Sequence, residues 1–251
     1  MARAAVPGGL RARRAWLPAV LLERRTESPS ARTLVLEVDE WTGHLPGQHV
    51  DVRLTAEDGY QTARSYSLAA PADGTRLEIT VQRTAGGEVS PFLTDGLGVG
   101  DRVEVRGPLG GWFVWRPADP GPVLLVAGGS GIVPLMAMIR ARAGVSRAPF
   151  RLVHSVRAPG DRIYAAELRR RAAEDGGLDV DYVYTREAPE GTPRPKGRIR
   201  ADDLVAHGWP PDFEPTCYVC GPTPLVEAVA GLLVGGGHDP DRIRTERFGG
   251  S

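Results

Sequence analysis

Residues 129–134 have the composition and the position expected of a phosphate-binding turn. The segment Gly129-Ser130-Gly131-Ile132-Val133-Pro134 follows an apolar run and precedes a helical pattern. Glycines at such a turn let backbone N–H groups approach a pyrophosphate, and the positive end of the next helix attracts its charge. Pro134 suits the first helical turn, where its missing N–H costs little. The segment predicts a dinucleotide site, with an ordinary strand-to-helix loop as the alternative.

The strand predicted after this turn carries groups that suit a phosphate. It offers Ser155 and Arg157 and no early acidic residue. NAD-specific folds place an Asp or Glu there for the ribose 2′-hydroxyl, whereas a hydroxyl and a guanidinium suit the 2′-phosphate of NADP. Arg186 and Arg198, in later loops, could reach the same point. We therefore predict a preference for NADPH; solvated loop arginines are the alternative.

The chain ends on Thr-Glu-Arg-Phe-Gly-Gly-Ser, which places an aromatic ring close to a terminus. Glu246 and Phe248 are two residues apart, so on a strand both side chains would point to the same side. Gly249 and Gly250 would permit the ring to move. A ring packed in the core is one interpretation of this position.

Cys217 and Cys220 are the two cysteines of the sequence. This number favours a reduced, cytoplasmic enzyme and excludes a four-cysteine iron–sulfur or zinc site within these residues. A metal-centred electron partner is therefore expected to be a separate protein. No histidine lies in a catalytic signature that would make Cys220 a nucleophile, and Cys217 is interpreted as a small core residue.

Composition limits the class of partner. The 251 residues are 41% hydrophobic, which is enough for one large or two small domains. Lys plus Arg number 31 and Asp plus Glu number 31, so no net field indicates nucleic acid or a membrane surface. No stretch approaches the ~20 apolar residues of a membrane span. Residues 1–14 are interpreted as a flexible basic tail.

The elements that must position these groups fall into two halves. Up to residue 106 the pattern is short, alternating and rich in β-branched residues, with a short helix predicted at 86–96. This half predicts an antiparallel β-barrel, with a sandwich as the alternative. The strands are expected at 19–26, 33–40, 48–55, 63–70, 76–83 and 101–108.

After residue 115 strands alternate with helices, which predicts an α/β parallel sheet (Rossmann-like) covered on both faces. The Pro- and Gly-rich stretch 116–122 is the expected boundary. The predicted domains are a barrel at 15–116 and a nucleotide-binding domain at 117–251. Strands are expected at 123–129, 150–156, 178–185 and 217–221, with a last strand at the C-terminus, and helices at 131–144, 163–177 and 224–237.

Five motifs in a fixed order extend this interpretation. They are Arg64-Ser65-Tyr66-Ser67, Gly87-Glu88-Val89-Ser90, Gly129-Ser130-Gly131 with Pro134, Cys220-Gly221-Pro222, and Glu246-Arg247-Phe248. Together, from about residue 16 to the C-terminus, they resemble the ferredoxin–NADP⁺ reductase superfamily of flavin enzymes.

The resemblance implies a flavin site on the barrel. It implies that Arg64 binds the flavin pyrophosphate, that the Tyr66 ring lies against the isoalloxazine, and that the Ser67 hydroxyl lies near flavin N5. FAD is expected, and FMN is the less favoured cofactor. The other residues implied to contact the flavin are Ser65, Val81, Arg83, Gly86, Gly87, Val89 and Ser90.

The resemblance also implies a reaction. Ser67, Cys220 and Glu246 would surround the path of a hydride that passes from NADPH to FAD, with Cys220 beside the nicotinamide C4 and with Gly221 and Pro222 among the cofactor-binding residues. Phe248 would lie over the isoalloxazine face, cover the active site and move aside for hydride transfer. Electrons would then pass to a separate ferredoxin, flavodoxin or oxygenase component. The alternatives are a non-catalytic flavin relay subunit and an NADH-dependent flavin or quinone reductase.

Three features bear on the donor and the acceptor. Ser130 stands where the family often has Thr, which keeps the hydroxyl. The extension beyond Phe248 is more typical of the oxygenase-reductase branch, where NADH is often the donor, and it opposes the argument from the arginines. Arg11, Arg13 and Arg14 could attract an acidic ferredoxin, and a solvated tail is the alternative.

Overall fold

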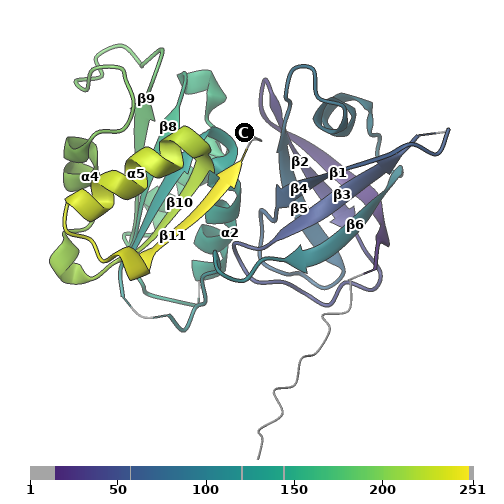
Figure 1. Ribbon diagram of the computed structural model, residues 1–251, viewed down its shortest axis with the longest axis horizontal. Coiled ribbons are helices and arrows are strands. Elements are labelled where there is room, and N and C mark those ends of the chain that lie inside the picture. Colours follow the sequence, from purple (N-terminus) through teal and green to yellow (C-terminus); the bar gives the residue numbers. More distant parts are fainter. Residues whose placement is uncertain (1–14, 57, 120, 144, 249–251) are drawn as a thin grey trace, which may run out of the picture.

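The computed structural model has two domains side by side, each built on one β-sheet (Figure 1). It describes residues 15–56, 58–119, 121–143 and 145–248. Within these residues no helix has the length and apolar character needed to cross a membrane. The predicted basic tail, with Arg11, Arg13 and Arg14, lies outside the described residues, as do Gly249 and Gly250.

The first domain is the predicted antiparallel barrel. Its strand order is β4-β3-β6-β1-β2-β5, and a bridge between Leu68 and Ile79 joins the two outer strands. All six predicted strands are present, with ends shifted by at most three residues. They are β1 (Leu17–Ser28), β2 (Ala31–Glu37), β3 (His49–Thr55), β4 (Gln61–Ser67), β5 (Arg76–Gln82) and β6 (Arg102–Leu109).

The barrel interior follows from the alternation of the strands, since every second side chain points inward. Leu34, Leu36 and Val50 are fully buried there. The predicted short helix is a single turn, α1 (Val89–Pro91), that continues as the π-helical turn η1 (Phe92–Gly96). Val89 and Leu93 anchor this helical segment in the barrel core.

The second domain has the predicted parallel sheet, in the order β11-β10-β7-β8-β9. Its strands are β7 (Val123–Gly128), β8 (Phe150–Val156), β9 (Leu178–Tyr184), β10 (Thr216–Pro222) and β11 (Ile243–Phe248). Its helices are α2 (Ile132–Arg142), α3 (Ala165–Glu174), α4 (Ala201–His207) and α5 (Thr223–Gly235). Helix α4 was not predicted from the sequence; it is short and begins after an arginine-rich loop.

Helices cover both faces of this sheet. Side chains of α2 and α3 share one buried cluster with Leu125 and Cys220, and side chains of α4 and α5 share the other with Leu124 and Cys217. The strands on either side of β7 are β8 and β10, so the strand order reverses there, and ligands of open α/β sheets bind beside the carboxyl ends of such strands.

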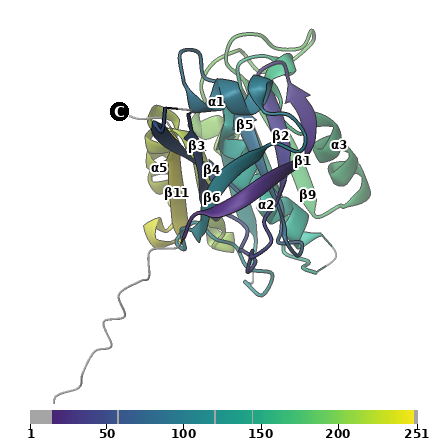
Figure 2. The same cartoon turned by 90° about the vertical axis from the view of Figure 1, so that its right-hand side faces the viewer.

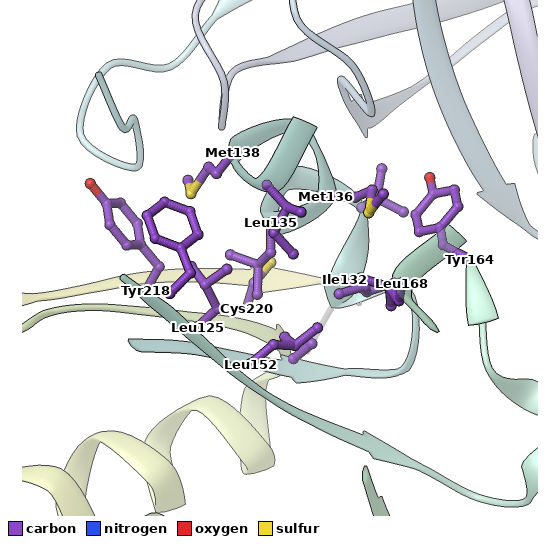
Figure 3. Packing of buried hydrophobic residues seen from close by; sticks show 14 of the residues in the cluster. Leu125, Ile132, Leu135, Met136, Met138, Leu152, Tyr164, Leu168, Tyr218 and Cys220 are labelled. Atoms are coloured by element: carbon purple, nitrogen blue, oxygen red, sulfur yellow. The ribbon is translucent and has the colours of Figure 1, made fainter. Parts of the chain in front are cut away.

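Helix α2 lies between the parallel sheet and the barrel. Every residue from Ile132 to Ile139 is buried, and their cluster also contains Ala31 and Ala69 of the barrel. Figure 3 shows Leu135 and Met138 of α2 beside Leu125 and Tyr218 of the sheet. Figure 2 views the molecule from the barrel side, with the α/β domain behind it. Packing on both sides explains why α2 lacks a polar face.

Buried polar groups also join the two domains. Arg140 of α2 contacts Glu78 of β5 at 3.1 Å and Glu167 of α3 at 2.6 Å, and it donates to the carbonyl oxygen of Ala69 at 3.0 Å. Tyr164 shares a hydrogen bond with Thr80 of the barrel. These contacts fix the position of the α/β domain against the barrel strands.

Candidate active site

The glycine segment forms a tight 3₁₀ turn, η2 (Gly129–Gly131), between β7 and α2. Gly129 has φ of +54°, a conformation that favours glycine. A Cβ on Gly131 would overlap the carbonyl oxygen of Cys220, and one on Gly221 would lie 3.0 Å from the Cα of Gly128. The turns after β7 and β10 therefore pack backbone against backbone, which brings the predicted phosphate turn next to Cys220.

Ser67, Cys220 and Glu246, predicted to lie together, form a buried group that we call the crevice cluster. Cys220 and Glu246 are register partners on β10 and β11, and Ser67 is the last residue of β4. Burial raises the pKa of Glu246 to about 7, and the nearby Ser67 hydroxyl opposes this rise. Burial and the Glu246 carboxyl together raise the pKa of the Cys220 thiol well above its usual value.

Two atoms of the crevice cluster lack partners. Ser67 Oγ and Glu246 Oε2 are both buried and make no hydrogen bond within the described residues. A buried polar atom without a partner costs free energy, so such atoms need a reason to be retained. They lie where the end of β4 approaches β10 and β11, and a bound group with its own donors and acceptors would satisfy them. The crevice cluster therefore fits a flavin ring system chemically.

The other residues of the first barrel motif differ in exposure. Tyr66 is half-buried, and burial raises the pKa of its hydroxyl to about 12. Arg64 is exposed and donates to the carbonyl oxygen of Ala63 at 2.7 Å, and no described carboxylate pairs with it. Ser65 donates its hydroxyl to Asp51 Oδ1 at 2.6 Å. Tyr66 and Arg64 are thus open to a ligand, whereas the Ser65 hydroxyl is engaged within the barrel.

The remaining residues predicted to contact the flavin differ in how accessible they are to a ligand. Gly86 has φ of +75° and nothing lies near its Cα, so the loop before α1 is open at that point. Ser90 accepts a hydrogen bond from the backbone N–H of Thr84 at 3.0 Å, in a turn that includes Gly87. The Val81 and Val89 side chains are buried in the barrel core, so only their backbone groups could contact a ligand.

Ser155, Arg157, Arg186 and Arg198, predicted to converge, line one cavity of about 490 Å³, which we call the arginine cavity. All three arginines are exposed, and none has an ion-pair partner among the described residues. No carboxylate is among the described residues that line it. Pro222 also lines it.

A second cavity of about 320 Å³ adjoins the first and shares Ser155 and Arg157 with it. It reaches the Gly129–Ser130 turn, so the two together form a groove from the turn to the arginines. Arg83, assigned to the flavin from the family resemblance, lines this groove and pairs with Asp95 at 2.9 Å. Pro134 is buried in α2 and lines neither cavity.

Phe248 ends β11 opposite Pro222, half-buried against the cluster that contains Cys220. In Figure 1, β11 ends at the side of the α/β domain that is next to the barrel. The ring thus lies beside Cys220 of the crevice cluster and also packs on the hydrophobic core. The position is compatible with a cover over the active site and with a ring packed in the core.

Sequence reasoning missed several residues of the groove. Asp161 and Thr185 line it from the α/β domain, and Ser30 and Gln82 line it from the barrel. His154, fully buried, contacts the carbonyl oxygen of Gly129. Asp161 follows the end of β8 by only a few residues. An acidic residue so close to the end of the second strand could have been recognised in the sequence as a candidate for binding the ribose.

No group of three or more metal-binding side chains occurs among the residues described here.

Two family models match the chain. The model described as an oxidoreductase FAD-binding domain matches residues 18–114, and the model described as an oxidoreductase NAD-binding domain matches residues 125–231. The first corresponds to the barrel and the second to the α/β domain.

Individual relatives agree with these models. The reductase subunit of an aromatic O-demethylase from Amycolatopsis is 33% identical over 244 residues, which cover 92% of this chain and 69% of that protein. The reductase subunit of glycine betaine monooxygenase from Pseudomonas aeruginosa is 37% identical over 215 residues, or 81% of this chain and 56% of that protein. The chain spans about half the length of most of these relatives.

Solved structures show the same arrangement. The flavohem-like FAD/NAD-binding domain of nitric oxide dioxygenase from Vibrio cholerae superposes with a TM-score of 0.81 at 25% identity, over 93% of this chain and 99% of that one. A cytochrome P450 reductase from Amycolatopsis gives a TM-score of 0.77 at 30% identity, over 93% and 70% of the respective chains.

Proposed function

The chain belongs to the ferredoxin–NADP⁺ reductase superfamily of FAD- and NAD(P)-binding oxidoreductases, and on this basis we propose that it transfers hydride from NADPH to FAD and passes the electrons to a separate acceptor. The observation that carries this proposal is the crevice cluster, where two unsatisfied polar atoms lie beside the turn of a dinucleotide groove.

In this proposal the barrel holds FAD. Tyr66 supplies a half-buried ring for the flavin face, and Arg64 supplies an unpaired guanidinium for its pyrophosphate. Ser67 offers a buried hydroxyl to the ring system. Bound FAD provides the redox chemistry, because it accepts a hydride and can release electrons one at a time.

The crevice cluster orients the reactants and excludes water. Cys220 is fully buried with a raised pKa, so it is a neutral thiol that packs beside the reacting groups and forms no bond to them. Glu246, with its pKa raised to about 7, exchanges a proton near neutral pH within reach of Ser67. Phe248 shields this crevice until the dinucleotide enters. Most of the rate enhancement then comes from positioning.

The arginine cavity favours NADPH over NADH. Three exposed guanidiniums without ion-pair partners, with Ser155 beside them, suit a 2′-phosphate, and the described lining has no acid for a 2′-hydroxyl. Asp161, in the adjoining part of the groove, favours NADH, as does the extension of the sequence beyond Phe248. A tenfold or greater preference for NADH in flavin reduction would contradict the assignment to NADPH.

The acceptor is proposed to be a ferredoxin or an oxygenase component. The matched glycine betaine monooxygenase and aromatic O-demethylase proteins are reductase subunits, which supports an acceptor of this kind. Cys217 and Cys220 are buried on opposite faces of the sheet as free thiols. Free thiols support a reducing, cytoplasmic location.

An absorbance spectrum and a panel of acceptors test this proposal. We expect the purified protein to be yellow, or to become so with FAD, and to reduce ferricyanide and a ferredoxin at the expense of NADPH. Protein that stays colourless after incubation with FAD or FMN would overturn the proposal. Flavin binding without any diaphorase activity would instead favour a relay subunit.

A further inference from the structure

His154 lies on β8, directly beneath the glycine turn, and has no role in the activity proposed above. Its side chain is fully buried, and its Nε2 is 3.0 Å from the carbonyl oxygen of Gly129. The Tyr182 ring lies beside it, with ring centroids 5.7 Å apart. Nδ1 is buried and has no hydrogen-bond partner within the described residues.

The charge state of His154 fixes the direction of this hydrogen bond. Burial, with a smaller contribution from the nearby Arg162, lowers its pKa to about 4 in spite of the hydrogen bond to Gly129, so the imidazole is neutral at physiological pH. A neutral imidazole carries one N–H, and a carbonyl oxygen can only accept. The proton is therefore on Nε2, which donates to Gly129.

This hydrogen bond orients the peptide that follows Gly129. The carbonyl and N–H groups of a trans peptide point in opposite directions. With the Gly129 carbonyl directed toward the His154 ring, the N–H of Ser130 points away from that ring, and Ser130 itself lines the groove. That N–H is a donor placed for an anion in the groove.

The Gly129 carbonyl does not need His154 for its own satisfaction. The backbone N–H of Ile132 already donates to it at the start of α2. The histidine costs free energy at this buried position, because its Nδ1 has no hydrogen-bond partner among the described residues. An apolar side chain would fill the same space without that cost. Gly129, with its positive φ, has more conformational freedom than other residues, so a second donor restrains a turn that is otherwise easily reoriented.

We propose that His154 is a positioning residue that holds the Gly129–Ser130 peptide so that the Ser130 N–H faces the pyrophosphate of a bound nicotinamide dinucleotide. The proposal rests on the dinucleotide binding proposed above. It assigns to β8 a role in recognition that is separate from the arginine cavity, although Ser155, the next residue along the strand, lines that cavity.

Calorimetric titration with two ligands tests this role without any turnover. NADP⁺ spans the whole groove, whereas adenosine 2′-monophosphate has no pyrophosphate and reaches only the arginine cavity. We expect His154→Phe to weaken NADP⁺ about tenfold, as for loss of one oriented donor, and to leave adenosine 2′-monophosphate unchanged. His154→Gln, whose amide nitrogen can take the place of Nε2, should retain most of the affinity for NADP⁺.

Control variants separate positioning from general destabilisation. Val153 is buried on the opposite face of β8, so Val153→Ala should lower the melting temperature and leave both dissociation constants unchanged. If His154→Phe does not fold, His154→Asn replaces it, because its shorter amide cannot reach the Gly129 carbonyl in the same way.

Two results would overturn the role of His154 alone. In the first, His154→Phe or His154→Asn binds NADP⁺ as tightly as wild type. In the second, the variant loses the same factor in affinity for NADP⁺ and for adenosine 2′-monophosphate. A wild-type protein that binds neither ligand would overturn the proposed function as well, so the two failures are distinguishable.

Discussion

The crevice cluster and the arginine cavity differ in burial and in charge. Ser67 and Cys220 are buried, and Glu246 is held largely out of water with its pKa raised to about 7. Arg157, Arg186 and Arg198 are exposed and keep their charge at the outer end of the groove. The glycine turn, η2, lies between these two regions.

This difference separates two tasks. A buried, weakly charged site excludes water and orients reacting groups, so its residues act on the rate of the chemical step. An exposed, charged cavity recognises a phosphate that takes no part in the reaction, so its residues act on affinity. Substitutions in the crevice cluster should therefore change the limiting rate, and substitutions in the arginine cavity should change the half-saturating concentration.

The turn that joins the two regions should be the most sensitive position. Gly131→Ala places a methyl group against the Cys220 carbonyl, so η2 and β10 must separate. We expect a loss of about 3 kcal/mol in the free energy of unfolding, measured with urea, and loss of dinucleotide binding. Gly231→Ala is the matched control, since nothing lies near Gly231 in α5, and it should stabilise the protein by about 0.5–1 kcal/mol. Equal behaviour of the two variants would refute the close packing.

Within the crevice cluster, Ser67→Ala should separate function from stability. The hydroxyl has no hydrogen-bond partner among the residues that the structure describes, so its removal should leave the melting temperature of the apoprotein unchanged or slightly higher. The limiting rate of flavin reduction should fall about 100-fold in rapid-mixing experiments, because orientation at the reacting centre is lost.

The matched control for Ser67→Ala is a buried hydroxyl with partners outside the crevice. Thr33 donates to Glu27 at 2.7 Å and shares a hydrogen bond with Thr80. Thr33→Val should cost stability and leave the rate unchanged. The role of Ser67 would be rejected if its variant lost stability and kept the wild-type rate.

In the arginine cavity, Arg157→Ala should raise the half-saturating concentration of NADPH roughly 30-fold, equivalent to about 2 kcal/mol, for loss of one charged partner. The limiting rate and the response to NADH should not change. Arg169→Ala removes the same charge from an exposed position on α3 and should have no effect. An equal change for NADH and NADPH would contradict the assignment of this cavity to the 2′-phosphate.

The last expected effect, and the smallest when it is taken per pH unit, is a pH dependence of stability from Glu246. Its pKa is about 7 in the folded chain against an ordinary value of 4.5, so between these values the folded state keeps a proton that the unfolded state releases. Apoprotein stability from this group is complete below pH 4.5 and falls as pH rises to about 7, by no more than ~1.4 kcal/mol per pH unit.

Urea unfolding at several pH values measures this slope. Glu246→Gln should flatten it, while Glu40→Gln, at an exposed carboxyl, should not. A slope that is the same in wild type and in Glu246→Gln would show that Glu246 titrates as it does in the unfolded chain.

Local patterns predicted most of the fold. Alternation and β-branched residues identified the six barrel strands, and the change to alternating strands and helices identified the parallel sheet. Helix α4 was missed because seven residues give too short a pattern for periodicity to be recognised. Its start depends on Asp203, which accepts a hydrogen bond from the backbone N–H of Arg200.

The arginine cavity was predicted from residues at the ends of neighbouring strands, and the crevice cluster, whose members come from both domains, was predicted from the family resemblance. Ser155 and Arg157 end one strand and Arg186 follows the next, so parallel pairing brings them together. The resemblance assigned Arg83 to the flavin, and its position in the groove beside Gly129 arises from a contact between the domains that is not visible in its own strand. His154 was missed since its partner is a backbone carbonyl, which no side-chain motif records.

Anaerobic rapid mixing of the FAD-loaded protein with NADPH tests the central claim most directly. We predict saturable loss of flavin absorbance, with a lower limiting rate in Ser67→Ala and only a higher half-saturating concentration in Arg157→Ala. Flavin that is not bleached by NADPH or by NADH would contradict the account.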